Sequence, residues 1–190
     1  GGMIAQTIAI RHPSRVLSLI SIYSMPAISE LPQPEPEIMR ILTVSPPHKK
    51  ETYVEYMLSV FKTIAGPRFG VDGPWTRKIM AESFDRSYYP AGIARQLFAI
   101  LTQRDRRPAL ASLKMPAPVI HGTDDPLVPV EAGRETAKCI PGAQLKVIDG
   151  MGHDLPHGGA WPQIVEAIVD FIKGVQVSLL IEANPLLKSA

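Results

Sequence analysis

The sequence predicts an α/β fold, with a core of three parallel strands and flanking helices and an all-helical segment inserted after the first strand. Apolar runs at 16–23, 119–121 and 144–149 suit strands of a parallel sheet. Between the first two runs, residues 26–108 contain no strand-like segment, and their apolar residues recur at helical spacing. From the second run onward, strands and helices alternate with short connections, which indicates right-handed parallel crossovers.

The composition is that of an ordinary globular protein. Of its 190 residues, 45% are hydrophobic, enough to bury the core of one domain with at most a small appendage. The 20 basic and 18 acidic residues form no basic block, which argues against nucleic-acid binding. The single cysteine, Cys139, excludes an internal disulfide, and without a signal-peptide pattern we expect a cytoplasmic protein. The stretch from Val175 to Ile181 is too short to span a membrane.

The chain begins with a predicted helix and a predicted strand. Its first residues, Gly1-Gly2-Met3, indicate a processed terminus or a fragment. Apolar residues among alanines predict a short, mostly buried helix over residues 1–10, ended by His12-Pro13. The run VLSLISIY at 16–23 then predicts a strand covered on both faces.

Helices punctuated by prolines are expected throughout the insertion. They are predicted around residues 38–42, 53–64, 75–79 and 93–101. The insertion also holds nine of the twelve aromatic residues, namely Tyr53, Tyr56, Phe61, Phe69, Trp75, Phe84, Tyr88, Tyr89 and Phe98. Helix packing accounts for most of them, and some could line an apolar ligand pocket.

The alternating pattern resumes in the second half of the chain. It predicts a strand at 119–121, a helix at 131–140, a strand at 144–149 and a helix at 161–172. We therefore expect a core of residues 1–25 and 109–173, a helical insertion of residues 26–108, and a tail of residues 174–190.

An acidic residue and a histidine follow the ends of two neighbouring predicted strands. Asp125 comes shortly after the strand at 119–121, and His153 shortly after the strand at 144–149. Loops at the carboxyl ends of parallel strands share one rim of the sheet, so the two side chains can meet. An aspartate that binds one imidazole nitrogen fixes the tautomer and leaves the other nitrogen as a general base. The pair is a candidate acid–base site without a nucleophile.

Both residues also have a purely structural interpretation. Asp125 precedes a proline and could cap a turn, and the neighbouring Asp124 competes for either role. His153 could be a solvated or capping histidine in a glycine-rich loop. The residues alone leave these alternatives open.

The remaining reactive side chains are expected to be structural. His121, at a strand end, is interpreted as a core histidine, and Cys139 as a core residue on an apolar helix face rather than a nucleophile. Loop positions are predicted for His12, His48 and His157. The sequence contains no metal-ligand spacing and no phosphate-binding glycine loop, so no metal or cofactor is expected.

Three stretches resemble the α/β-hydrolase family. IHGTDDPLVP at 120–129 is similar to that family's loop for the triad acid, which falls three residues after the glycine and implies Asp125 rather than Asp124. GMGH at 150–153 resembles the loop of the triad histidine. GGMIAQ at 1–6 resembles the helix after the nucleophile elbow, which implies a serine two positions before Gly1. The insertion corresponds to the family's helical cap.

The resemblance implies the carboxyl-terminal part of a cap-bearing hydrolase that cleaves an ester of a small apolar substrate through a Ser-Asp-His triad. The chain alone is then expected to be inactive, because the nucleophile and the oxyanion loop lie upstream of residue 1. An aspartate nucleophile would instead suit a haloalkane dehalogenase or an epoxide hydrolase. A non-catalytic ligand-binding module and an inactive gene fragment are further alternatives, and the oligomeric state stays open.

Overall fold

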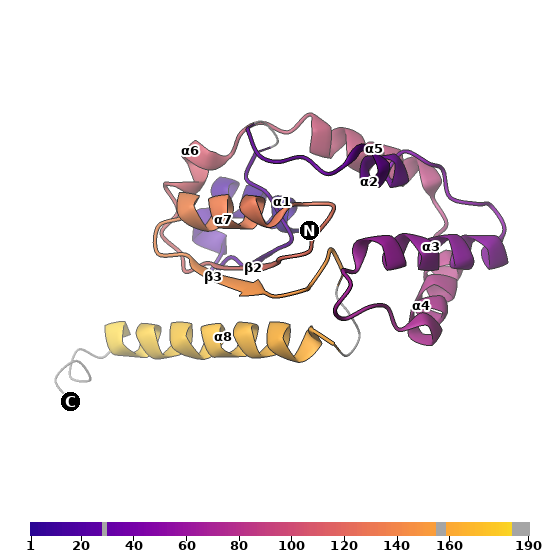
Figure 1. Cartoon of the computed structure of the whole chain (residues 1–190). Helices are drawn as coiled ribbons and strands as arrows, with labels where there is room; N and C mark the ends of the chain where they lie inside the picture. The colour runs from indigo at the N-terminus through magenta and orange to yellow at the C-terminus, as the bar shows by residue number, and fades with distance from the viewer. Residues whose placement is uncertain (28–29, 155–158, 184–190) are drawn as a thin grey trace.

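A three-stranded parallel sheet lies at the centre of the molecule (Figure 1). The computed structural model describes residues 1–27, 30–154 and 159–183, with side chains as far as Gln176. The strands β1 (Ser21–Ile22), β2 (Pro118–Gly122) and β3 (Gln144–Ile148) lie in that order, all parallel. The predicted α/β class with three parallel strands is confirmed.

Helices surround the sheet on both faces. In chain order they are α1 (Gly2–Arg11), the 3-10 turn η1 (Pro13–Arg15), α2 (Pro36–Ile41), α3 (Lys50–Ile64), α4 (Gly73–Arg86), α5 (Pro90–Leu101), α6 (Arg107–Leu110), α7 (Val130–Cys139) and α8 (Trp161–Ala183). Figure 1 shows α1 and α7 on one face of the sheet and α8 on the other. Strand β2 is therefore buried along its whole length, as a central parallel strand must be.

The first strand is shorter than its apolar run predicts. Only Ser21 and Ile22 pair with β2, and the Leu19 amide donates to the Pro116 carbonyl just before the paired region. The register aligns Ser21 with Val119, so residues 16–18 run past the point where β2 begins. Leu17 is 82% exposed there. The predicted strand over 16–23 was too long, because an apolar run does not show where the partner strand begins.

Helix α1 is less buried than expected. Its side chains Ile4 and Ile8 are exposed, whereas the polar Gln6 is fully buried. Gln6 donates to the Ser21 hydroxyl over 3.2 Å and accepts from Arg106 Nε over 3.0 Å. These bonds satisfy its amide, so a polar residue occupies the position that faces the sheet.

The predicted helices of the insertion are all present, and the last helix extends beyond its prediction. Helix α8 continues past Ile172, the expected end, to Ala183, so a glycine at position 174 does not stop it. Its residue Ile164 packs with Ile120 and Ile148 in a core cluster beneath the sheet. None of the helices in the described ranges combines the length and the apolar character required to cross a bilayer.

Two glycines allow the loop after β3 to approach its neighbours closely. A Cβ on Gly122, at the end of β2, would lie 1.9 Å from the Met151 carbonyl oxygen. A Cβ on Gly152 would lie 2.2 Å from the Ile64 carbonyl oxygen at the end of α3. The loop is thus held between the sheet and α3, where only glycine fits.

We predict that Gly122→Ala lowers the free energy of unfolding by about 1–3 kcal/mol, because its new methyl group would collide with the Met151 backbone. Gly174→Ala is the control, since a Cβ there would meet no atom within 4 Å. Replacing a glycine within a helix should raise stability by about 0.5–1 kcal/mol. Urea unfolding of both variants measures the difference, and equal stability of the two would contradict the close approach.

Candidate functional site

The loop after β2 binds the carboxylate of Asp125 with its own backbone. Asp125 Oδ1 accepts hydrogen bonds from the amides of Leu127 over 2.9 Å and Val128 over 2.7 Å. This is the turn-capping role that the sequence left open, and it fixes the direction of the side chain. The loop thus binds Oδ1, and Oδ2 is left to bind another partner.

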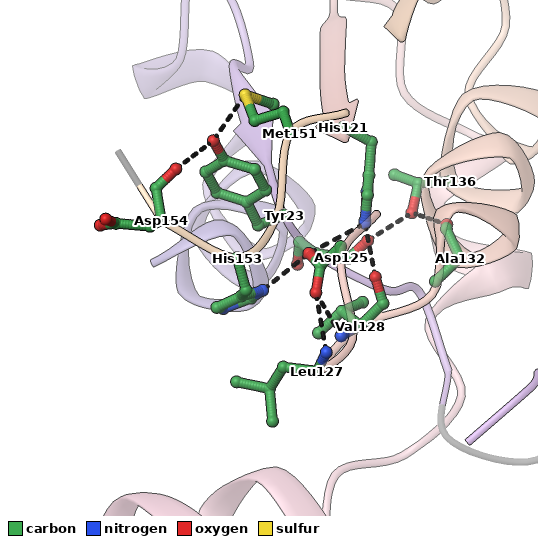
Figure 2. Close-up of polar contacts among 11 residues, drawn as sticks. Tyr23, His121, Asp125, Leu127, Val128, Ala132, Thr136, Met151, His153 and Asp154 are labelled. Atoms are coloured by element: carbon green, nitrogen blue, oxygen red, sulfur yellow. Dashed lines mark hydrogen bonds and ion pairs between the residues drawn. The ribbon is translucent and has the colours of Figure 1, made fainter. Parts of the chain in front are cut away.

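That partner is His153, in the loop after β3. Its Nδ1 lies 2.8 Å from Asp125 Oδ2 (Figure 2). The His153 amide donates to the Ile64 carbonyl over 2.6 Å and the Gly152 amide to the Ala65 carbonyl over 3.1 Å. The last carbonyls of α3 therefore set the position of the histidine. The structure brings together the two residues that the sequence singled out.

Two further bonds tie the aspartate loop to the histidine loop. The Gly150 amide donates to the Thr123 hydroxyl over 2.7 Å, and the Asp124 amide donates to the Met151 carbonyl over 3.0 Å. Gly150 adopts a positive φ of 73°, a conformation that favours glycine. The two loops thus form one connected unit at the carboxyl ends of β2 and β3.

The neighbouring acid does not compete for the histidine. Asp124 is exposed, and its carboxylate accepts from the Thr123 hydroxyl over 2.8 Å. The Asp125 side chain is fully shielded from solvent. The geometry therefore pairs His153 with Asp125.

The surroundings of Asp125 keep it ionised. Burial by itself would raise the pKa of its carboxyl, but hydrogen bonds from His121 and His153, the attraction of His153 and the Val128 amide lower the pKa to about 2. A carboxylate can only accept, so the proton in the bond to His153 sits on Nδ1. In the neutral imidazole the Nε2 atom of His153 is then an acceptor, as a general base requires.

A cavity of about 650 Å³ opens beside His153. Its walls are mostly apolar and come from α1, α2, α5 and the loop after β2, including Ile4, Ile8, Met39, Leu97, Ile100 and Leu127. The first residue of the chain, Gly1, lines the same cavity. The site therefore combines an imidazole, the buried carboxylate bound to it and an apolar space of the size that small-molecule sites have.

Tyr23 is a site residue that the sequence analysis missed. Its hydroxyl donates to the Asp154 carbonyl over 2.6 Å, and its ring centroid lies 5.3 Å from that of His153 (Figure 2). Burial, with the charges of Asp154 and Asp125, raises the pKa of the phenol, so the hydroxyl stays protonated. Tyr23 has a positive φ of 50°, unusual for an aromatic residue. The sequence signal for a role of Tyr23 in the site was its position directly after the first strand.

The other reactive residues are His121, which is buried beside Asp125, and Cys139, His48 and His157. His121 is fully buried, as predicted, and burial together with Glu135 raises the pKa of the Cys139 thiol to about 11, which disfavours a nucleophile. His48 contacts Tyr88, and His157 lies outside the described residues. Within those residues, no group of three His, Cys, Asp or Glu side chains could hold a metal ion.

Known proteins match this chain in sequence. A family model described as alpha/beta hydrolase fold matches residues 1–160. A non-heme chloroperoxidase of Kitasatospora aureofaciens is 45% identical over 47 residues, which are 24% of this chain and 17% of that protein. The chain thus matches only a small share of that relative's length.

Solved structures match over most of this chain. An esterase from Rhodococcus sp. ECU1013 superposes with a TM-score of 0.68 at 19% identity, covering 92% of this chain and 62% of that one. An enol-lactonase from Burkholderia xenovorans LB400 gives 0.64 at 23% identity, covering 90% of this chain and 62% of that one. At these identities the likeness is one of fold, and the chain spans about 62% of the length of either structure.

We predict a stability loss at acidic pH that depends on Asp125. Its folded pKa of about 2 lies below the usual 3.8, so its contribution is complete above about pH 4 and is lost as the pH falls through 2. At 1.36 kcal/mol per pKa unit, the loss is about 2 kcal/mol. In urea unfolding across this range, the wild type and the exposed control Asp124→Asn should lose about 2 kcal/mol more stability than Asp125→Asn. A loss of the same size in Asp125→Asn would refute the assignment.

We also predict that Tyr23→Phe lowers the free energy of unfolding by about 1 kcal/mol, because the bond to the Asp154 carbonyl disappears while the ring remains. Tyr89→Phe is the matched control, since the Tyr89 side chain is exposed and its ring is kept. That variant should stay within about 0.5 kcal/mol of the wild type. Thermal or urea unfolding measures both, and a neutral Tyr23→Phe would argue against the role of the hydroxyl.

Proposed function

Because the chain belongs to the α/β-hydrolase fold family, we propose that it is the carboxyl-terminal part of an enzyme that hydrolyses carboxylic esters of small apolar substrates. The observation that carries this proposal is the bond between buried Asp125 and His153 at the mouth of an apolar cavity. An imidazole with one nitrogen bound to a carboxylate and the other free is the base that acyl transfer requires.

The proposed mechanism takes its nucleophile from a segment upstream of residue 1. The serine lies two positions before Gly1, which is supported by the place of Gly1 on the cavity that His153 also lines. His153 Nε2 removes the hydroxyl proton as the serine oxygen attacks the ester carbonyl, and then gives that proton to the leaving alkoxide. Water activated by the same nitrogen attacks the acyl-enzyme, releasing the carboxylic acid and restoring the serine.

Asp125 supports both steps by holding the imidazole. Its negative charge stabilises the imidazolium that forms while His153 carries the proton. The carboxylate is already bound by two backbone amides, so it needs no rearrangement during the reaction. Backbone amides that stabilise the oxyanion belong, in this proposal, to the upstream segment.

The helices of the insertion are proposed to form a cap that shapes the substrate site. Helices α2 and α5 contribute Met39, Leu97 and Ile100 to the cavity wall, and α1 of the core contributes Ile4 and Ile8. Apolar walls on both sides favour a substrate with an aliphatic or otherwise apolar acyl or alkyl group. Residues 26–108 would therefore select the substrate, and residues 1–25 and 109–173 would supply the acid and the base.

Peroxide chemistry is a second candidate, favoured by the similarity to a chloroperoxidase. Hydrogen peroxide in place of water would convert the same acyl-enzyme to a peroxycarboxylic acid, again with His153 as the base. An aspartate two positions before Gly1 would favour the dehalogenase or epoxide hydrolase alternatives. A residue there with no nucleophilic side chain would favour a ligand-binding module.

We predict that purified residues 1–190 do not hydrolyse p-nitrophenyl butyrate, because an acid and a base without a nucleophile cannot form the acyl-enzyme. The same chain extended by its encoded upstream segment should hydrolyse this ester, and His153→Ala should reduce kcat at least about a thousandfold. His12→Ala, at an exposed position, is the control and should keep the activity. Turnover by residues 1–190 that His153→Ala abolishes would contradict the proposal.

A further inference from the structure

His121 is a buried histidine next to the candidate pair. It is the fourth residue of β2, and its side chain is completely shielded from solvent. Its Nε2 lies 2.7 Å from the Val128 carbonyl oxygen and 3.4 Å from Asp125 Oδ2 (Figure 2). Asp125 therefore has an imidazole on each side, with His153 toward the cavity and His121 toward the sheet.

The contact with Val128 determines where the His121 ring carries its proton. A backbone carbonyl oxygen can only accept, so a bond of 2.7 Å requires the proton on Nε2. Nδ1 has no hydrogen-bond partner among the described residues. A Cβ on Gly133 of α7 would lie 2.4 Å from Nδ1, so the ring is packed directly against the helix backbone. His121 and His153 thus have opposite tautomers.

Burying a ring nitrogen without a partner is unfavourable, and an aliphatic residue would fill the same space without that cost. The donor on Nε2 is what an aliphatic residue could not provide. It holds the carbonyl of Val128, whose amide in turn donates to Asp125 Oδ1. His121 therefore holds the carbonyl group of Val128, the residue whose amide binds the carboxylate of Asp125.

We propose that His121 is a positioning residue, which through its Nε2–H holds Val128 and Asp125 in the orientation that directs Asp125 Oδ2 at His153. This inference rests on the proposed roles of Asp125 and His153. It adds a buried second imidazole whose function is to fix the geometry of the acid, and which exchanges no proton with a substrate.

The test is imidazole NMR of ¹⁵N-labelled residues 1–190, which requires no catalytic turnover. In the wild type, nitrogen shifts should assign the Nε2–H tautomer to His121 and the Nδ1–H tautomer to His153. The His153 Nδ1 proton should be strongly deshielded by the carboxylate, and its exchange with water measures how firmly the pair is held.

Three variants then isolate the donor. His121→Leu removes the donor and should accelerate exchange of the His153 Nδ1 proton about tenfold, as expected for the loss of a buried hydrogen bond. His121→Gln, whose amide nitrogen takes the place of Nε2, should keep the exchange within about twofold of the wild type. His12→Gln controls for removal of an exposed histidine and should change nothing.

Three outcomes would overturn the inference. They are an Nδ1–H tautomer for His121 in the wild type, unchanged exchange in His121→Leu, and exchange in His121→Gln as fast as in His121→Leu. If His121→Leu does not fold, two other measurements decide the question. They are the tautomer of His121 in the wild type and the exchange rate of the His153 Nδ1 proton in His121→Gln compared with the wild type. Because no step measures hydrolysis, these results can be interpreted even if the ester-hydrolase proposal fails. Likewise, failure of this inference would not decide the ester-hydrolase proposal.

Discussion

The buried negative charge of Asp125 is the constraint on which the rest of this site depends. A carboxylate shielded from water must be paired or hydrogen-bonded, and here two backbone amides bind one oxygen while His153 binds the other. Hydrogen bonds to a charged group contribute about 1.5–3 kcal/mol each, so the turn after β2 and the loop after β3 are stabilised by the arrangement that orients His153. In the proposed mechanism, folding and chemistry rely on the same contacts.

The histidine loop also joins the core to the helical insertion. Backbone amides of Gly152 and His153 bind the last carbonyls of α3, which an α-helix leaves without partners of its own. The position of His153 therefore depends on a helix outside the sheet, and that helix sits beyond the strands' carboxyl ends (Figure 1). A change in the insertion could reach the base through this contact as well as through the cavity wall.

The sequence predicted the α/β class, the order of the elements and the Asp125–His153 pair, because apolar periodicity and loop position after a strand are local signals. It overestimated the first strand, whose length is limited by where β2 begins at Pro118. It also expected α1 to bury its isoleucines, whereas Gln6 faces the sheet with partners distant in sequence. The bond of Tyr23 to Asp154 joins residues distant in sequence, so its partner could not be read from a local pattern. The bond of His121 to Val128 depends on how the loop after β2 folds back on the strand, which apolar periodicity does not report.

The central claim is that Asp125 and His153 are the acid and base of a triad completed by an upstream serine. The most direct measurement is labelling of the upstream-extended chain with a fluorophosphonate, followed by mass-spectrometric mapping of the modified residue. The account predicts a single modified serine two positions before Gly1, with labelling strongly reduced in His153→Ala and in Asp125→Asn. Absence of label, label on another residue, or equal labelling in His153→Ala would contradict it.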